Sequence, residues 1–266
     1  MNSYNIQTDE IAVSYLSGEL RPEPIGADHC HDKYEIILVL SAEGKYKIEG
    51  REYSVGARTL MLIKPLVYHR VSIDNASSFE GYALRFSKSA LSGTVLHMLE
   101  KITAGEGESG RYYSHGSVSD ALVSAFERFE IADTLPDIEK DAFMRALLYE
   151  ILILLSAEEG QKITLTDGEL GARVVRYLNE NITKNISLDR LARRFFVSKY
   201  HLCRAFKNYS GISVHSYINH KRIMYAKTLI EAGETASGAA YKVGFGDYSA
   251  FYRAYVKIVG SSPTKN

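Results

Sequence analysis

The segment AAYKVGFGDYSAFYRAY, from Ala239 to Tyr255, decides how the last third of the chain folds. Its first half is apolar at helical spacing, and Gly244 follows, a residue that adopts the positive φ of a tight turn without steric cost. Asp247 then stands where a helix N-cap is expected, and Phe251 lies one helical turn before Tyr255 on a single face. The spacing therefore predicts a short helix, a glycine-centred turn and a second helix.

The outer face of that second helix carries polar and aromatic side chains. A helix that presents such groups fits the major groove, where the base edges offer hydrogen-bond donors, acceptors and methyl groups. The sequence thus predicts a helix-turn-helix whose DNA-binding residues are Asp247, Tyr248, Ser249 and Arg253.

A second copy of the pattern lies upstream, in ISLDRLARRFFVSKYHLCRAFKNYSGIS, residues 186–213. Ser187 and Ser198 are expected to cap its two helices, with a break near Phe196. The segment 213–233 between the copies predicts one helix that ends at Gly233 and sets the spacing of the two motifs. The residues of the upstream copy predicted to bind DNA are Ser198, Lys199, Tyr200, His201, Cys203, Arg204 and Lys207.

These motifs resemble the DNA-binding domain of the AraC/XylS family of bacterial transcription regulators over residues 171–263. The resemblance rests on A-x-x-V-G-F-x-D-x-S-x-F-x-R, which starts at Ala240, and on G-x-S-P, which ends at Pro263. It implies two reading helices, residues 198–208 and 247–257, in successive major grooves on one face of DNA. Two departures are Phe196, where the family usually has glycine, and Ala250, where a larger side chain is common. A bulky residue at positive φ is strained, so we expect the first turn to be distorted or built differently.

The charge distribution separates the two ends of the chain. Lysine and arginine together number 32 and so do aspartate and glutamate, which gives no net charge. Residues 170–266, however, hold 16 basic and 5 acidic side chains, whereas residues 1–169 hold 16 and 27. A basic domain joined to an acidic one is expected of a DNA-binding protein with a separate regulatory part.

The first part of the chain reads as β structure. YEIILVL, GKYKIEG, REYSV, RTLMLIKP and FEGYALRFS are short β-branched or aromatic runs separated by turn residues, which is typical of a small barrel or sandwich. Hairpin turns are expected at residues 42–44 and 49–51. Two helical segments follow at 117–132 and 137–160, the second apolar on most sides, and a polar linker is expected at 157–167.

This β region resembles the cupin-type sensor barrel over residues 29–87. The evidence is His29-x-His31-x3-Glu35 and Pro65-x3-His69, although Val67 replaces the usual glycine of the second motif. The resemblance implies that three histidines and one glutamate from neighbouring strands converge. Imidazoles and a carboxylate suit a divalent cation, but the same groups also line polar pockets or fasten strands. The residues expected to bind an organic effector are His29, His31, Glu35, Tyr68, His69 and Tyr82.

The complete prediction is an α+β protein with two domains. Residues 1–160 form a cupin-like effector-binding and dimerisation domain, with the barrel at about 20–90 and helices at about 91–158. Residues 169–266 form an all-α DNA-binding domain with two helix-turn-helix motifs. The predicted function is a sequence-specific, effector-responsive transcription regulator that binds double-stranded DNA as a homodimer, contacts RNA polymerase if it activates, and responds to a sugar or related metabolite.

Several features bear on the class and location of the protein. No catalytic triad, phosphate loop or acid pair stands out, so we expect no enzyme activity. No cofactor is expected, and a divalent metal at His29, His31, Glu35 and His69 is the less favoured interpretation. The two cysteines, Cys30 and Cys203, form no disulfide framework, and the chain shows no signal peptide or membrane span, which favours the cytoplasm. The alternatives are a cupin-type metalloenzyme fused to a DNA-targeting module and an architectural DNA protein without an effector.

Overall fold

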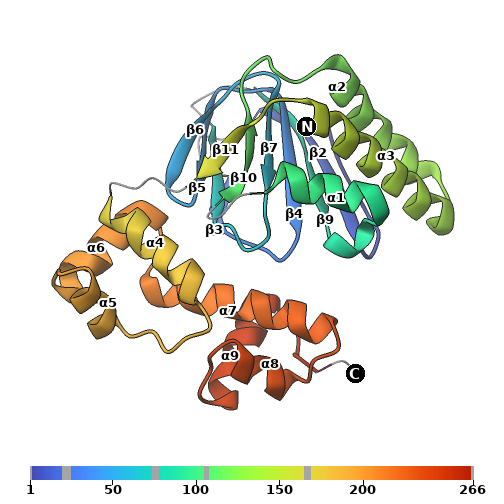
Figure 1. The fold of residues 1–266 in the computed structure, drawn as a ribbon. Coiled ribbons are helices and arrows are strands. Elements are labelled where there is room, and N and C mark those ends of the chain that lie inside the picture. The colour runs from blue at the N-terminus through green and yellow to red at the C-terminus, as the bar shows by residue number, and fades with distance from the viewer. Residues whose placement is uncertain (1, 20–24, 74–77, 105–107, 165–168, 265–266) are drawn as a thin grey trace. The chain divides into compact units, whose positions relative to one another are not determined.

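A computed structural model describes residues 2–19, 25–73, 78–104, 108–164 and 169–264 of the 266-residue chain. The chain divides into two compact units, one formed mainly by residues 1–164 and the other mainly by residues 165–266 (Figure 1). The first unit is rich in β-strands, whereas residues 169–264, the main part of the second, contain helices as their regular secondary structure. The predicted order, a β domain followed by a helical domain, is confirmed.

Two sheets form the N-terminal unit. The larger sheet has the strand order β1-β2-β9-β4-β7-β10-β11, and the smaller has the order β3-β8-β5-β6. The strands of the larger sheet are β1 (Asn2–Gln7), β2 (Ile11–Glu19), β4 (Tyr34–Ser41), β7 (Thr59–Ile63), β9 (Ser78–Phe86), β10 (Glu108–Tyr113) and β11 (Gln161–Thr164). Those of the smaller sheet are β3 (Ile25–His29), β5 (Gly44–Ile48), β6 (Arg51–Val55) and β8 (His69–Ile73).

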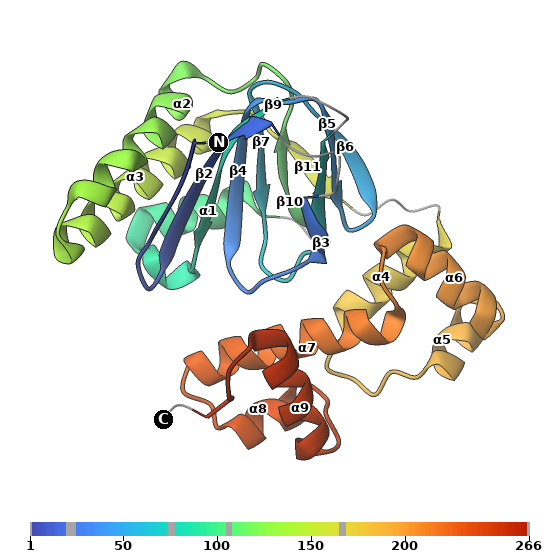
Figure 2. The ribbon, with the colours of Figure 1, turned by 180° about the vertical axis from the view of Figure 1, so that it is seen from behind.

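The central strands β4 and β7 of the larger sheet are buried on both faces, so they are apolar almost throughout. Alternate residues of β4 point to opposite sides, as pleating requires. Ile37 and Val39 pack with Tyr46 and Ile48 of the smaller sheet in one core. Ile36 and Leu38 lie in a second core with the helical layer. That layer, seen against the sheet in Figures 1 and 2, comprises η1 (Lys88–Ala90), α1 (Gly93–Ile102), α2 (Asp120–Glu127), η2 (Arg128–Thr134) and α3 (Asp137–Ala157).

Most of the local predictions for this unit are confirmed, and two are wrong. The five runs predicted as strands are β4, β5, β6, β7 and β9. Residues 42–44 do not close a hairpin, because β4 and β5 belong to different sheets. Residues 49–50, with φ values of 46° and 85°, do form the turn between β5 and β6. The expected linker at 157–167 contains β11, which pairs with β10, and residues 165–168 lie outside the described residues.

Six helices build the described part of the C-terminal unit. They are α4 (Leu170–Asn181), α5 (Leu188–Arg194), α6 (Lys199–Ser210), α7 (Val214–Glu231), α8 (Ala236–Lys242) and α9 (Tyr248–Val259). Five of them begin at an N-cap whose side chain accepts a hydrogen bond from a backbone N–H of the first turn: Ser187, Ser198, Ser213, Thr235 and Asp247. Each such cap contributes about 1 kcal/mol, so the sequence specifies these helix starts locally. Across the described ranges, no helix is long and apolar enough to cross a membrane.

Candidate functional site

The two helix-turn-helix turns have the same backbone hydrogen bonds. In the first, Phe196 N–H donates to the Arg193 carbonyl at 3.2 Å and Val197 N–H donates to the Ala192 carbonyl at 3.0 Å. In the second, Gly244 and the residue after it repeat this pattern, with distances of 3.0 Å. Phe196 adopts φ 56°, so the expectation of a distorted first turn is wrong: the turn is built as in the second copy, with the strain carried by a phenylalanine.

The residues predicted to bind DNA lie on the predicted reading helices α6 and α9 or, for Ser198 and Asp247, at their N-caps. All are exposed except Cys203, which is partly buried, while Leu202 and Phe206 of α6 and Phe251 and Tyr255 of α9 are buried. Exposure makes the set accessible, and its role in DNA binding stays a prediction. The exposed residues of α6 and α9 outside the predicted DNA-binding set are Asn208, Tyr252, Val256 and Lys257. The helical period already placed Tyr252 and Lys257 on outward arcs, so that signal was available in the sequence.

Two predicted contacts have local partners in this structure. Lys199 Nζ lies 2.8 Å from Asp189 Oδ1, and both side chains are more than half exposed. Such a surface pair is worth little, so Lys199 can exchange Asp189 for a phosphate at small cost. Asp247 accepts the Ala250 N–H at 2.7 Å, so its carboxylate is engaged in capping α9.

Arg222 of α7 joins the two motifs. Its guanidinium donates to the carbonyls of Ile182, Lys184 and Gly244 at 2.8, 2.6 and 2.9 Å. The first two carbonyls belong to the connection between α4 and α5, and the third belongs to the turn before α9. A Cβ on Gly244 would lie 2.5 Å from the Thr183 carbonyl oxygen, so glycine also permits this close approach. We call this arrangement the Arg222 clasp.

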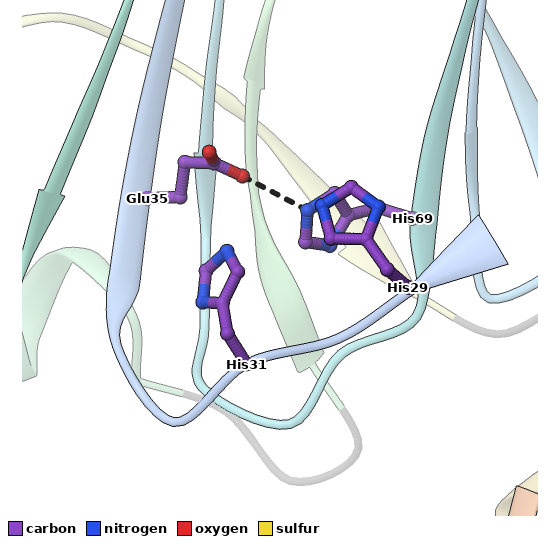
Figure 3. Close-up of side chains that lie close together, drawn as sticks. All are labelled: His29, His31, Glu35 and His69. Carbon is purple, nitrogen blue, oxygen red and sulfur yellow. Dashed lines mark ion pairs between the residues drawn. The ribbon is translucent and has the colours of Figure 1, made fainter. Parts of the chain in front are cut away.

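The second candidate site is a cluster of three histidines and one glutamate in the β unit (Figure 3). His29 ends β3 and His69 begins β8, which are neighbours in the smaller sheet. Glu35 lies in β4 of the larger sheet, and His31 lies between β3 and β4. The structure thus brings together the four residues of the two cupin-like motifs, at a point where the two sheets meet.

Hydrogen bonds orient two of these side chains. His69 Nδ1 lies 2.8 Å from the Val67 carbonyl oxygen, which can only accept, so Nδ1 carries a proton. Nε2 of His69 therefore faces Glu35 Oε2, at 2.9 Å, and Arg85 Nε donates to Glu35 Oε1 at 2.7 Å. Backbone and guanidinium partners of this kind orient histidine and carboxylate ligands in metal sites.

The cluster has the donor set that a divalent cation needs, with ligand atoms close enough to be drawn together. One ligand atom from each residue lies within 4.8 Å of the others, and Glu35 and His69 are buried. Ligands bound at about 2.0–2.2 Å lie about 3–3.5 Å apart around a tetrahedral ion, so small side-chain rotations would close the set. Tyr46 stacks on His69 with ring centroids 6.2 Å apart. Burial raises the pKa of Tyr46 well above its ordinary value, and the neighbouring Glu35 raises it further, so this phenol stays neutral.

The two tyrosines predicted to bind the effector, Tyr68 and Tyr82, lie in different surroundings. Tyr68 precedes β8 and is buried. Tyr82 is opposite Leu38 in the β4–β9 register and belongs to the core shared with the helices. Glu35 is opposite Arg85 and points to the other side of the sheet. Tyr82 therefore does not belong to the four-residue cluster, and its assignment to that site is wrong, because strand alternation sends it to the helical face.

Two family models match the chain. The AraC-like ligand binding domain matches residues 22–152, and a helix-turn-helix domain matches residues 191–265. The uncharacterized HTH-type transcriptional regulator YbfI of Bacillus subtilis is 24% identical over 224 residues, covering 84% of this chain and 80% of the relative. The HTH-type transcriptional activator RhaS of Klebsiella pneumoniae is 24% identical over 254 residues, covering 91% and 87%.

Among solved structures, the chain is similar to ToxT of Vibrio cholerae bound to an unsaturated fatty acid, at 16% identity, with 96% and 94% of the two chains covered and a TM-score of 0.42. The DNA-binding domain of AdpA in complex with a target DNA is 24% identical over 36% of this chain and 87% of that one, with a TM-score of 0.34. The assignment rests on the sequence matches, which span both units. The chain belongs to the AraC/XylS family of transcription regulators and combines its ligand-binding and DNA-binding domains.

Proposed function

We propose that the protein binds a specific operator and that a sugar or related metabolite, bound in the β unit, changes this binding. The observation that carries the proposal is the cluster of His29, His31, Glu35 and His69 in a chain that also presents two reading helices. Three imidazoles and one carboxylate whose ligand-type atoms lie within 4.8 Å of one another suit a polar ligand or a divalent cation. A binding role accounts for their convergence better than strand fastening does.

The chemistry of the cluster suits an oxygen-rich ligand. The imidazoles of His29 and His31 are only partly buried and can donate to or accept from hydroxyl groups. Glu35 offers carboxylate oxygens that Arg85 already holds in place. A sugar can bind these groups directly. A divalent cation held by the same four residues is the second candidate, favoured by the short separations between the ligand atoms.

The proposal also covers the oligomeric state and the location of the protein. Ile153 of α3 is 46% exposed and Ile138 is 85% exposed, which leaves apolar surface on a helix whose opposite face is buried in the unit. We propose that this surface forms a homodimer in the cytoplasm, and that the protein contacts RNA polymerase if it activates. The dimer would place two pairs of reading helices on one operator, which lengthens the DNA sequence that is read.

We infer that the protein regulates transcription without enzymatic turnover, because the relatives YbfI and RhaS are named as a transcriptional regulator and a transcriptional activator. The alternative is a metalloenzyme attached to a DNA-targeting module. Incubation of the purified protein with the metabolite that alters DNA binding, followed by mass spectrometry of the mixture, separates the two. Conversion of the metabolite would favour the enzyme.

The central experiment selects bound DNA from random duplexes with the full-length protein, with and without pools of metabolites. We expect a defined site and a shift of affinity with one pool. His31→Gln should abolish the shift while leaving basal DNA binding intact, and His97→Gln, an exposed histidine on α1, is the matched control. A site that responds to no pool, or an unaltered response in His31→Gln, would refute the proposal.

A separate experiment tests whether a metal ion binds at the histidine cluster. Protein purified without chelator is analysed for bound metal, and the metabolite titration is repeated after chelation. A response that survives chelation shows direct binding, whereas one that is lost and is restored by a divalent cation shows binding through the metal. Absence of metal from the purified protein, with a retained response, would exclude the second candidate only.

A further inference from the structure

A cavity of about 720 Å³ lies in the β unit, and its lining residues come from β1, β2, β4, β9, α2 and η2. Tyr82 lines it, and this residue points away from the histidine cluster. Its chemically distinctive lining consists of three tyrosines and three glutamates, which we call the tyrosine–glutamate pocket: Tyr4, Tyr15, Tyr82, Glu80, Glu127 and Glu130. The volume falls in the range of small-molecule sites.

The three tyrosines form a continuous aromatic wall. Tyr4 and Tyr15 stack with ring centroids 5.5 Å apart, and Tyr15 and Tyr82 are 4.8 Å apart. Tyr82 also lies 5.5 Å from Phe126 of α2, so the wall is anchored in the core between sheet and helices. The Tyr15 hydroxyl donates to Glu80 Oε1 at 2.8 Å, which fixes one carboxylate beside the rings. The wall is therefore rigid where it meets the cavity.

The tyrosine–glutamate pocket is rich in carboxylates. Among the described residues, no lysine, arginine or histidine lies within ion-pair distance of Glu80, Glu127 or Glu130. Burial raises the pKa of Tyr4 to about 12, and the charge of Glu130 adds to the shift. The phenols thus stay neutral near pH 7, and the carboxylates give the cavity its negative charge. Residues 1–169 carry the same excess, with 27 acidic and 16 basic side chains.

We propose that the tyrosine–glutamate pocket binds an organic cation that carries two or more amino groups. Ammonium groups have donors only, whereas the carboxylates and phenol oxygens here accept. Charge-assisted hydrogen bonds are the strong ones, and aromatic faces or edges beside them provide apolar contact for the methylene chain of such a ligand. A single inorganic ion would fill only a small part of a cavity of this volume.

Binding here would act on the helical layer. The cavity is lined by strands on one side and by α2 and η2 on the other, and α2 and η2 pack against α3 in the same core. A cation bridging Glu80 of β9 and Glu127 of α2 would tie the helices to the sheet. The ligand is therefore a second effector, distinct from the metabolite proposed for the histidine cluster, and it would bias the surface that carries Ile153.

The test uses the full-length protein and spermidine as the probe. Isothermal titration is carried out in buffer with sodium chloride and, separately, magnesium chloride at matched ionic strength. We expect saturable binding of one spermidine per chain that the salts do not reproduce. Glu80→Gln should weaken it about tenfold or more, since it removes a charged acceptor. Glu159→Gln, at an exposed glutamate two residues after the end of α3, carries the same charge change and should bind as wild type.

Two further measurements keep the outcome decisive. Glu127→Gln with Glu130→Gln alters only exposed carboxylates, so this variant will fold even if Glu80→Gln does not. It should also weaken spermidine binding, while circular dichroism stays unchanged. A heat of binding that depends on ionic strength alone would overturn the proposal. Equal affinity for spermidine in Glu159→Gln and in the pocket variants would also overturn it. Binding of a second copy of the chain in place of spermidine, detected by sedimentation and lost in the same variants, would also overturn it.

Discussion

Phe196 and Gly244 occupy the same place in two turns of the C-terminal unit: each donates its N–H to the carbonyl three residues earlier, with φ of 56° and 91°. Glycine adopts this conformation freely, whereas an L-residue with a side chain pays about 1–2 kcal/mol. Phe196 is 94% exposed, so contacts of its ring within the unit do not offset that cost. The first motif therefore stores strain that the second does not.

Replacement of Phe196 by glycine should raise the free energy of unfolding by about 0.5–1 kcal/mol, because relief of strain exceeds the added chain entropy. Urea denaturation followed by the helical circular dichroism signal measures the change. Phe196→Ala removes the ring but keeps the strain and should leave stability nearly unaltered. Equal stabilisation by alanine and glycine would show that the exposed ring, rather than the backbone, is the cost.

Arg222→Lys should uncouple the two motifs, because an ammonium cannot reach three separate carbonyls as a guanidinium does. We expect roughly tenfold weaker binding to a duplex that contains both half-sites and little change on a duplex with one. Fluorescence titration against both duplexes provides the comparison. If both affinities fall by the same factor, the clasp supports the fold of each motif and does not set their spacing.

Arg204 on α6 is exposed and is predicted to read a base, so Arg204→Ala should cost about 1–3 kcal/mol on the cognate site and relax preference at one base pair. Lys207→Ala should weaken binding to all DNA sequences alike. It should also reduce the slope of log affinity against log salt concentration by about one unit. Arg253→Ala on α9 should be the milder arginine change. Titrations of these variants against cognate and scrambled duplexes at several salt concentrations test these expectations. Equal losses of affinity on both duplexes for Arg204→Ala would show that Arg204 contacts the DNA backbone.

Two positions on α3 separate dimerisation from folding. Leu148 is fully buried in the core of its own unit, whereas Ile153 is 46% exposed. Leu148 is therefore not available as an interface residue, and Leu148→Glu should misfold because it buries an unpaired charge. Ile153→Glu should give a folded monomer, detected by sedimentation together with circular dichroism. A folded dimer of Ile153→Glu would place the interface elsewhere.

The acid stability of the N-terminal unit should depend on Arg145, which donates to Glu10 at 2.7 Å and to Asp141 at 2.6 Å. Hydrogen bonds from Ser89 and Arg145 hold the pKa of Glu10 below its ordinary value, and the bond from Arg145 does the same for Asp141. Carboxyls with lowered pKa values favour the folded state above about pH 4, and this contribution disappears as the pH falls through their folded values.

Arg145→Met should therefore lower the free energy of unfolding by about 1 kcal/mol at pH 7, with the difference from wild type shrinking below pH 4. Thermal melts between pH 2.5 and 7 provide the measurement. A difference that stays constant over this range would mean that Arg145 stabilises α3 through its bond to the Ala90 carbonyl alone.

Local chemistry made the C-terminal unit predictable from its sequence. Ser187, Ser198 and Asp247 cap their helices through contacts three residues away, so a short window of sequence contains the full signal. The resemblance to cupin-type barrels likewise predicted that four ligand-type residues converge, as the structure shows they do. Their binding role stays a prediction.

Long-range relationships explain what the sequence could not predict. The assignment of Tyr82 failed because both faces of β9 are buried, so apolar character does not reveal which face meets the helices. The pairing of Arg85 with Glu35 depends on a register between β4 and β9, which are separated by some fifty residues. On α3 the apolar residues surround most of the helix, and periodicity alone could not distinguish Leu148 from Ile153.

The Arg222 clasp has a consequence for the DNA. With the two motifs held together through three carbonyls and the close approach at Gly244, the duplex is the more deformable partner. Successive major grooves on one face lie about 34 Å apart, and any mismatch with the reading helices must be met by bending. Bending a site of this length costs about 1–6 kcal/mol and depends on the base steps, with pyrimidine–purine steps the most flexible. Base pairs between the half-sites, which no side chain touches, should therefore influence which operators the protein selects.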